Sequence, residues 1–185
     1  TIKVIADKAT AYLNHRVNRH QELVSLDRHK KLAVMIDIDE TALSNFVAIR
    51  EWINGVNNVG DSLPDHIIRN LKIFWHDPAI LPVLNLYRTA KKNHVAVFFV
   101  TGRTEKDRKK TELNLRYSGY THYQKLIMRS SAQQAMSAKD YKIDEANAIV
   151  AKGYDLVLAI GDQYSDLPNV ADRQYKLPNP YYYIA

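Results

Sequence analysis

Acidic side chains follow two short apolar runs of the sequence. Asp37 and Asp39 come directly after the first run, and Asp162 and Asp166 come after the last. Carboxylates brought together repel one another unless a cation lies between them. Hard oxygen ligands, with room for water and a substrate phosphate, suit Mg²⁺ better than zinc. The four aspartates therefore predict a magnesium site, to which Asp39 lends its backbone carbonyl and Asp166 binds directly or through a water.

The residues around this acidic group are those that phosphoryl transfer needs, namely a nucleophile and groups that neutralise spreading charge. Asp37 is placed to attack phosphorus, which is an established use of a carboxylate. Asp39 can act as general acid toward the leaving group and then activate water. Thr101 and the Gly102 amide follow another apolar run and can hold a phosphoryl oxygen, and Lys142 supplies positive charge. These residues predict a covalent phosphoryl-enzyme mechanism.

Two basic residues leave alternatives open. Lys139 lies three positions before Lys142 and could take the same role. Arg103, directly after Gly102, either reaches the site or pairs with a local carboxylate.

The elements that must position these residues alternate between strands and helices. Nearly continuous apolar runs are typical of strands buried on both faces of a parallel sheet, and they occupy residues 32–37, 95–100, 126–128 and 156–160. Helix-patterned stretches precede or separate them at residues 5–24, 83–93, 105–118 and 139–152. This alternation predicts an α/β fold with a doubly wound parallel sheet. Because ligands bind outside the carboxyl ends of such strands, the side chains above should meet at one edge.

Two segments fall outside the alternation. The interval between the first two strands is about twice what a strand–helix unit needs, and its excess, residues 42–80, predicts a small helical cap that faces the substrate. Tyr181 to Tyr183, after two prolines, predict an extended tail that covers an edge of the sheet.

Composition narrows the classes of function. The chain has 185 residues, a size suited to a single domain with an insertion, and it has no cysteine, which excludes thiolate nucleophiles and Cys-based zinc sites. The formal net charge of +6 is scattered and no nucleic-acid motif accompanies it, so we expect no nucleic-acid partner. No apolar run approaches the length of a membrane span. The chain begins at Thr1 rather than Met, and we expect that it was trimmed, either as a signal peptide is removed or by cloning.

The motifs resemble the haloacid dehalogenase superfamily, in which Asp-x-Asp-x-Thr, a Thr at the next strand end, a Lys and Gly-Asp-x-x-x-Asp occur in this order. Residues 37–45, 98–103, 160–167 and 175–184 look like the secreted acid phosphatases related to plant vegetative storage proteins, and more loosely like bacterial class C acid phosphatases. The resemblance implies a Rossmann-like three-layer sandwich spanning residues 1–185. It also implies hydrolysis of small phosphate monoesters at acidic pH, in a secreted or periplasmic setting.

Carried over by position, the resemblance implies that Asp37 is the nucleophile and Asp39 the acid and base. Thr101 and Lys142 would hold the phosphate, and the pairing of Tyr141 with Lys142 favours Lys142 over Lys139.

Two further functions remain as alternatives. A storage or binding protein on the same fold could lack the nucleophile, whereas Asp37 is present here with its supporting residues. A response-regulator receiver accepts phosphate after its third strand, where this chain has Met128 and Arg129 and no aspartate.

Overall fold

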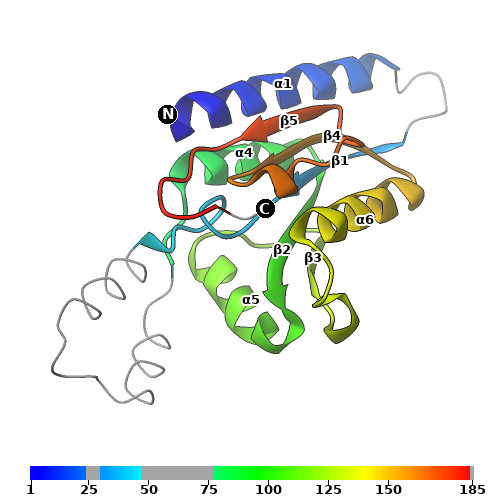
Figure 1. The fold of residues 1–185 in the computed structure, drawn as a ribbon. Helices are drawn as coiled ribbons and strands as arrows, with labels where there is room; N and C mark the ends of the chain where they lie inside the picture. Colours follow the sequence, from blue (N-terminus) through cyan, green and yellow to red (C-terminus); the bar gives the residue numbers. More distant parts are fainter. Residues whose placement is uncertain (24–29, 47–76, 184–185) are drawn as a thin grey trace, which may run out of the picture.

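Five parallel strands form one sheet in the order β3-β2-β1-β4-β5 (Figure 1). The computed structural model describes residues 1–23, 30–46 and 77–183. The strands are β1 Lys31–Ile36, β2 Ala96–Thr104, β3 Lys125–Arg129, β4 Tyr154–Gly161 and β5 Arg173–Lys176. The longer helices are α1 Ile2–Leu23, α4 Leu81–Lys92, α5 Arg108–Tyr117 and α6 Ala138–Ala151.

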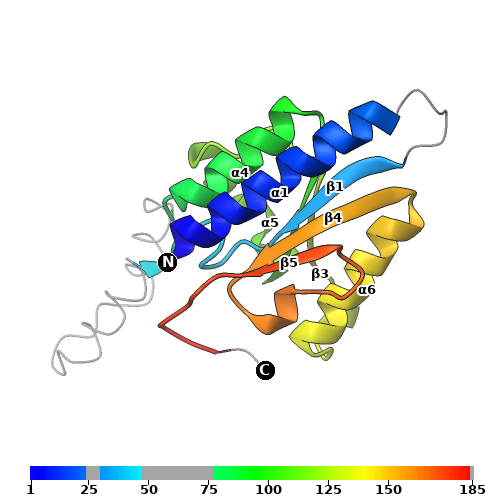
Figure 2. The ribbon, with the colours of Figure 1, turned by 90° about the horizontal axis from the view of Figure 1, so that it is seen from above.

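Helices cover both faces of this sheet. Side chains of a strand alternate between the two faces, and in β1 the residues Val34 and Ile36 enter one buried cluster while Ala33 and Met35 enter another. The first cluster includes apolar residues of α1 and α4, and the second includes those of α6. Figure 2 shows α1 and α4 side by side, with α6 across the sheet from them. The predicted α/β fold with three layers is confirmed.

The fifth strand was not predicted from the sequence. Residues 173–176 read Arg-Gln-Tyr-Lys and pair in parallel with β4, from Leu158 opposite Arg173 to Gly161 opposite Lys176. Their polarity hides them from a search for apolar runs, because β5 is an edge strand whose side chains remain partly exposed. One lateral edge of the sheet is therefore formed by β5, and the other by β3. After β5, Asn179 and Tyr182 contact residues that follow β4, namely Asp162 and Gln163, and the Tyr181 ring packs against Phe46.

The two ends of the predicted cap insertion lie beside each other. Ser44 N donates to Pro78 O at 2.9 Å, Ile80 N donates to Ala42 O at 2.9 Å, and Leu43 forms an antiparallel bridge with Ala79. The cap itself was predicted over residues 42–80, and its central part, 47–76, lies outside the described residues. The chain therefore leaves and returns at the same place, and the helical cap stays a prediction.

The leading helix matches the amphipathic pattern of the sequence. Ala6, Ala9, Leu13 and Val17 of α1 are buried, and they recur at the spacing of one helix face. Across residues 1–23, 30–46 and 77–183, no helix has both the length and the apolarity that crossing a bilayer requires.

Candidate active site

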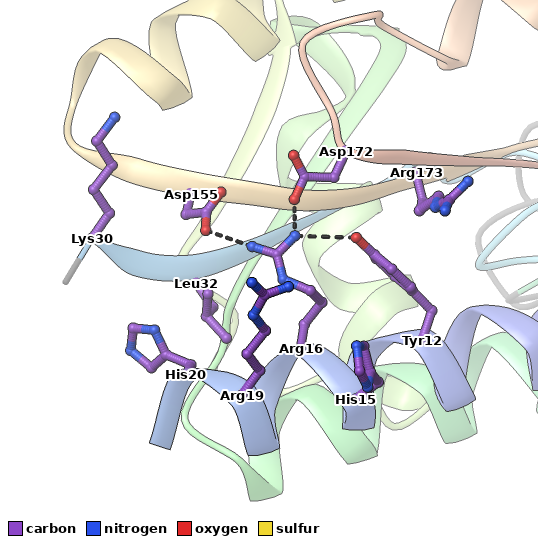
Figure 3. A pocket seen from close by; sticks show the side chains of 10 residues that line it. All are labelled: Tyr12, His15, Arg16, Arg19, His20, Lys30, Leu32, Asp155, Asp172 and Arg173. Carbon is purple, nitrogen blue, oxygen red and sulfur yellow. Dashed lines mark hydrogen bonds and ion pairs between the residues drawn. The ribbon is translucent and has the colours of Figure 1, made fainter. Parts of the chain in front are cut away.

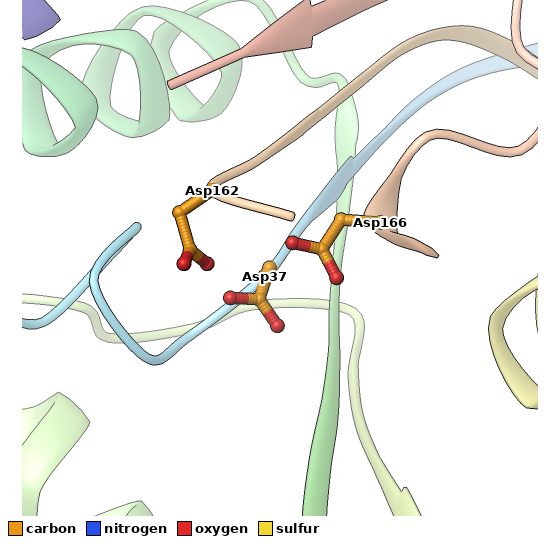
Figure 4. A group of neighbouring side chains, drawn as sticks. All are labelled: Asp37, Asp162 and Asp166. Carbon is orange, nitrogen blue, oxygen red and sulfur yellow. The ribbon is translucent and has the colours of Figure 1, made fainter. Parts of the chain in front are cut away.

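Three aspartates meet at the carboxyl ends of two neighbouring strands, β1 and β4. Asp37 follows β1, Asp162 follows β4, and Asp166 lies in the short helical turn Tyr164–Asp166 that comes next. One carboxylate oxygen of each lies within 4.8 Å of the others, and Figure 4 shows the three side chains converging. All three are at most 4% exposed. The structure thus brings together the side chains that the sequence placed at separate strand ends.

Lys142 lies against two of these aspartates. Its ammonium, on α6, donates to Asp37 Oδ1 and to Asp166 Oδ1. Burial by itself would lower the pKa of Lys142, but the two carboxylates outweigh burial and raise it above its ordinary value. Lys142 is therefore charged in the folded protein. Lys139 is exposed and lines a separate surface cavity beside Tyr164, so only Lys142 of the two contacts the carboxylates.

The negative charge of the three carboxylates exceeds the positive charge of the groups that contact them. Burial and the charge of Asp166 raise the pKa of Asp37 well above its ordinary value, although Lys142 acts to lower it. Asp162 accepts hydrogen bonds from neutral groups, namely Thr41 Oγ1 at 3.3 Å, Gln163 Nε2 at 2.6 Å and Asn179 Nδ2 at 2.6 Å. Three buried carboxylates thus share one contacting ammonium. A divalent cation would relieve this repulsion.

The donor set fits magnesium. Asp37, Asp162 and Asp166 supply hard carboxylate oxygens, which Mg²⁺ prefers. Hydrogen bonds from Thr41 and Asn179 to Asp162 would fix that carboxylate as second-sphere contacts do in metal sites.

Asp39 points to a different set of partners. Arg103 Nη2 donates to Asp39 Oδ1 at 2.7 Å, and Asn45 Nδ2 donates to the same oxygen at 2.7 Å. Burial would raise the pKa of Asp39, but Arg103 and Asn45 outweigh it and hold the pKa below its ordinary value. The sequence left open whether Arg103 reaches the site or pairs with a carboxylate. It does both, because the carboxylate with which it pairs, that of Asp39, belongs to the candidate site. Asp39 is ionised in this arrangement.

Thr101 and Gly102 end up beside Asp39. The buried Thr101 hydroxyl lies 3.4 Å from Asp39 Oδ2 and accepts a hydrogen bond from Arg103 N at 3.2 Å. Gly102 is exposed, and a Cβ placed on it would meet no atom within 4 Å. Gly102 therefore borders open space, whereas the Thr101 side chain is buried against Asp39.

Sequence reasoning missed the contribution of the chain's last residues. Asn179 bonds Asp162, and its Oδ1 accepts hydrogen bonds from Tyr181 N at 2.8 Å and Tyr182 N at 3.4 Å. Burial and the nearby charges of Asp162, Asp39 and Asp37 raise the pKa of Tyr182, which places its phenol in the field of the carboxylates. Asn179 lies seventeen residues after Asp162, so no local spacing could have linked them.

Gly161, at the end of β4, gives a test of how tightly Asp166 is packed. A Cβ at Gly161 would lie 2.1 Å from Asp166 Cβ and 2.4 Å from Asp166 Oδ2. Because this is far inside van der Waals contact, Gly161→Ala should lower the free energy of unfolding by about 1–3 kcal/mol and displace Asp166. Chemical denaturation measures the loss. Gly102→Ala is the matched control, since its Cβ has open space, and equal stability of the two variants would contradict the packing described here.

Comparison with protein families gives one match over the whole chain. The family described as HAD superfamily, subfamily IIIB (Acid phosphatase) matches residues 1–185. Acid phosphatase 1 of Solanum lycopersicum is 37% identical over 152 residues, which are 81% of this chain and 58% of that protein. Stem 28 kDa glycoprotein of Glycine max is 32% identical over 163 residues, which are 86% of this chain and 63% of that protein. The chain therefore spans 58% and 63% of the length of these two relatives.

More distant likenesses extend to storage proteins and solved structures. Vegetative storage protein 1 of Arabidopsis thaliana is 29% identical over 151 residues, 81% of this chain and 54% of that protein. The class C acid phosphatase of Bacillus anthracis superposes with a TM-score of 0.69 at 16% identity, covering 98% of this chain and 79% of that one. At that identity the structural match shows a shared fold. The family match over all 185 residues decides membership, as the motifs predicted: the chain belongs to the HAD superfamily, subfamily IIIB, the acid phosphatases.

Proposed function

We propose that this chain is a magnesium-dependent phosphatase that hydrolyses small phosphate monoesters through a phosphoryl group on Asp37. One observation carries the proposal, namely the three buried carboxylates of Asp37, Asp162 and Asp166 with the Lys142 ammonium against two of them. Burying such a cluster lowers the stability of the fold, because each uncompensated charge opposes folding. Its presence therefore favours a functional role. Membership of the acid phosphatase subfamily supports the same reaction.

The first chemical step forms a bond between a carboxylate oxygen of Asp37 and phosphorus, while the bond from phosphorus to the ester oxygen breaks. Lys142, Thr101 and the Gly102 amide would hold the phosphoryl oxygens and balance their charge. Bound at the three carboxylates, magnesium would neutralise charge on the phosphoryl group. Asp39 would give its proton to the departing alcohol.

The second step removes the phosphoryl group from Asp37. Asp39 takes a proton from a water molecule, whose oxygen attacks phosphorus, and the bond between phosphorus and Asp37 breaks to release phosphate and restore the carboxylate. Hydrogen bonds from Arg103 and Asn45 keep Asp39 ionised and oriented in the substrate-free protein. For the first turnover Asp39 must take a proton from solvent before it can act as the acid, and in each later turnover it gives the proton that it took from water in the preceding second step.

A non-catalytic storage or binding role on the same fold is the second candidate, because relatives of the chain include vegetative storage proteins. The presence of Asp37 at the end of the central strand, in contact with Lys142, favours catalysis. A secreted or periplasmic location also belongs to this proposal, and it rests on the resemblance to secreted acid phosphatases.

Dependence on magnesium gives the broadest test. We expect the protein to release phosphate over many turnovers from a panel of small phosphomonoesters, including an aryl phosphate, when Mg²⁺ is present. Chelation with EDTA should remove essentially all turnover, and Mg²⁺ added in excess should restore it, because a required metal supplies several kcal/mol of charge stabilisation. A storage protein would show no turnover in either condition. Full activity in EDTA would contradict the metal site while leaving a phosphatase in place.

A further inference from the structure

A second cavity lies at the end of the sheet opposite the carboxylates. It has a volume of about 750 Å³ and is bordered by α1 and by the first residues of β1, β4 and β5 (Figure 3). The charged residues that line it and matter here are Arg16, Arg19, Lys30, Asp155, Asp172 and Arg173. Since β4 has eight residues, its amino end lies roughly 25 Å from Asp162. The cavity is therefore separate from the candidate active site.

Arg16 forms ion pairs with both carboxylates that line the cavity, those of Asp155 and Asp172. Arg16 Nη2 donates to Asp155 Oδ2 at 2.8 Å, and Arg16 Nη1 donates to Asp172 Oδ2 and, at 3.1 Å, to Tyr12. Arg16 is mostly buried, with 21% of its side chain exposed. This network joins α1 to the start of β4 and to Asp172, directly before β5 (Figure 3).

Three other cations line the cavity without such partners. Within the described part of the chain, Arg19, Lys30 and Arg173 form no ion pair with a carboxylate. Arg173 lies over the Tyr12 ring, 5.7 Å from its centroid, and Arg19 and Lys30 are exposed. Arg19 lies on α1, Lys30 directly before β1, and Arg173 on the edge strand β5. The fold thus places positive charges that are far apart in the sequence around one cavity. An anion with several charged groups would match these cations in charge.

We propose that this cavity binds a small molecule that carries several phosphate groups. Guanidinium groups match phosphate oxygens in geometry and charge, and two of the three cations that form no ion pair with a carboxylate in the described part of the chain are arginines. The volume lies within the range of small-molecule sites. Separate positions of the three cations favour a ligand with more than one phosphate over a single phosphate ion. The proposal is independent of the proposed function, because it uses none of the residues of the acidic cluster.

Calorimetric titration with sodium tripolyphosphate in magnesium-free buffer tests this site. Without magnesium the buried carboxylates repel polyanions, so binding at the active site is disfavoured. The double variant Arg19→Ala/Lys30→Ala should bind tripolyphosphate about tenfold more weakly or worse. Arg173→Ala, on a different element, should also weaken binding. The control Lys109→Ala/Lys110→Ala removes two exposed charges from α5 and should bind as the parent does.

The result that overturns the proposal is equal affinity in the two double variants, or no binding by the parent. Turnover of an aryl phosphate in the presence of Mg²⁺ separates the two sites. Arg19→Ala/Lys30→Ala should keep parental turnover, because its residues lie at the far end of the sheet, and a parallel loss of turnover would contradict a separate site. Failure of tripolyphosphate to bind would leave the proposed phosphatase activity untouched.

Discussion

Replacing Asp37 with asparagine is expected to reduce turnover of an aryl phosphate by about 10⁴-fold or more, as removal of a covalent nucleophile does in other enzymes. The amide oxygen has almost the same shape as the carboxylate but carries no negative charge with which to attack phosphorus. The fold should survive, because Lys142 keeps its ion pair with Asp166 and one of three mutually repelling charges is removed. Steady-state kinetics measures the loss, and circular dichroism reports on the fold.

Asp144→Asn is the matched control for this experiment. Asp144 lies on α6 and is exposed, so the same chemical change there should leave turnover within the error of the assay. Parental turnover in Asp37→Asn would end the proposal that Asp37 carries the phosphoryl group, even if the protein remained a metal-dependent phosphatase.

Lys142→Met should have the second largest effect, on both stability and turnover. The side chain of Lys142 is 5% exposed and its ammonium contacts Asp37 and Asp166, so its removal leaves two buried carboxylates without a counter-charge. In EDTA, the free energy of unfolding should fall by about 3–5 kcal/mol. With Mg²⁺ present, turnover should fall by about 10²–10³-fold, as when a charge-stabilising donor is removed.

Lys139→Met separates the two lysines that the sequence left as alternatives. Lys139 is exposed, so its replacement should change the free energy of unfolding little and should leave turnover near the parental value. Urea denaturation and kinetics on both variants give the comparison. A larger loss of turnover in Lys139→Met than in Lys142→Met would reverse the assignment of the phosphate-holding lysine.

The sheet and the acidic cluster could be predicted because both depend on short stretches of sequence. A strand buried on two faces must be apolar throughout, which made β1 and β4 visible. Residues directly after parallel strands must meet at one edge of the sheet. Asp37 and Asp162 could therefore be placed together from their positions alone, although 125 residues separate them in sequence.

Features that depend on side-chain direction or on polar segments could not be predicted. β5 is polar because it lies at the edge of the sheet, so its hydrogen bonds with β4 leave no apolar pattern. Arg103 lies near the carboxyl end of β2, where only the packed structure decides that its guanidinium turns toward Asp39. Asn179 reaches Asp162 because the chain after β5 returns across the carboxyl ends of the strands. Each of these contacts joins segments whose spacing in sequence carries no signal.

The most direct measurement of the central claim is to look for the phosphoryl group on Asp37 itself. The protein would be mixed with an aryl phosphate and Mg²⁺, quenched in acid during turnover, digested, and analysed by mass spectrometry. The account predicts that the peptide containing Asp37 gains the mass of one phosphoryl group, that Asp37→Asn shows no such gain, and that a chiral phosphate ester is hydrolysed with retention of configuration at phosphorus. Inversion at phosphorus with no modified peptide would mean that water attacks the substrate directly, and it would contradict the account.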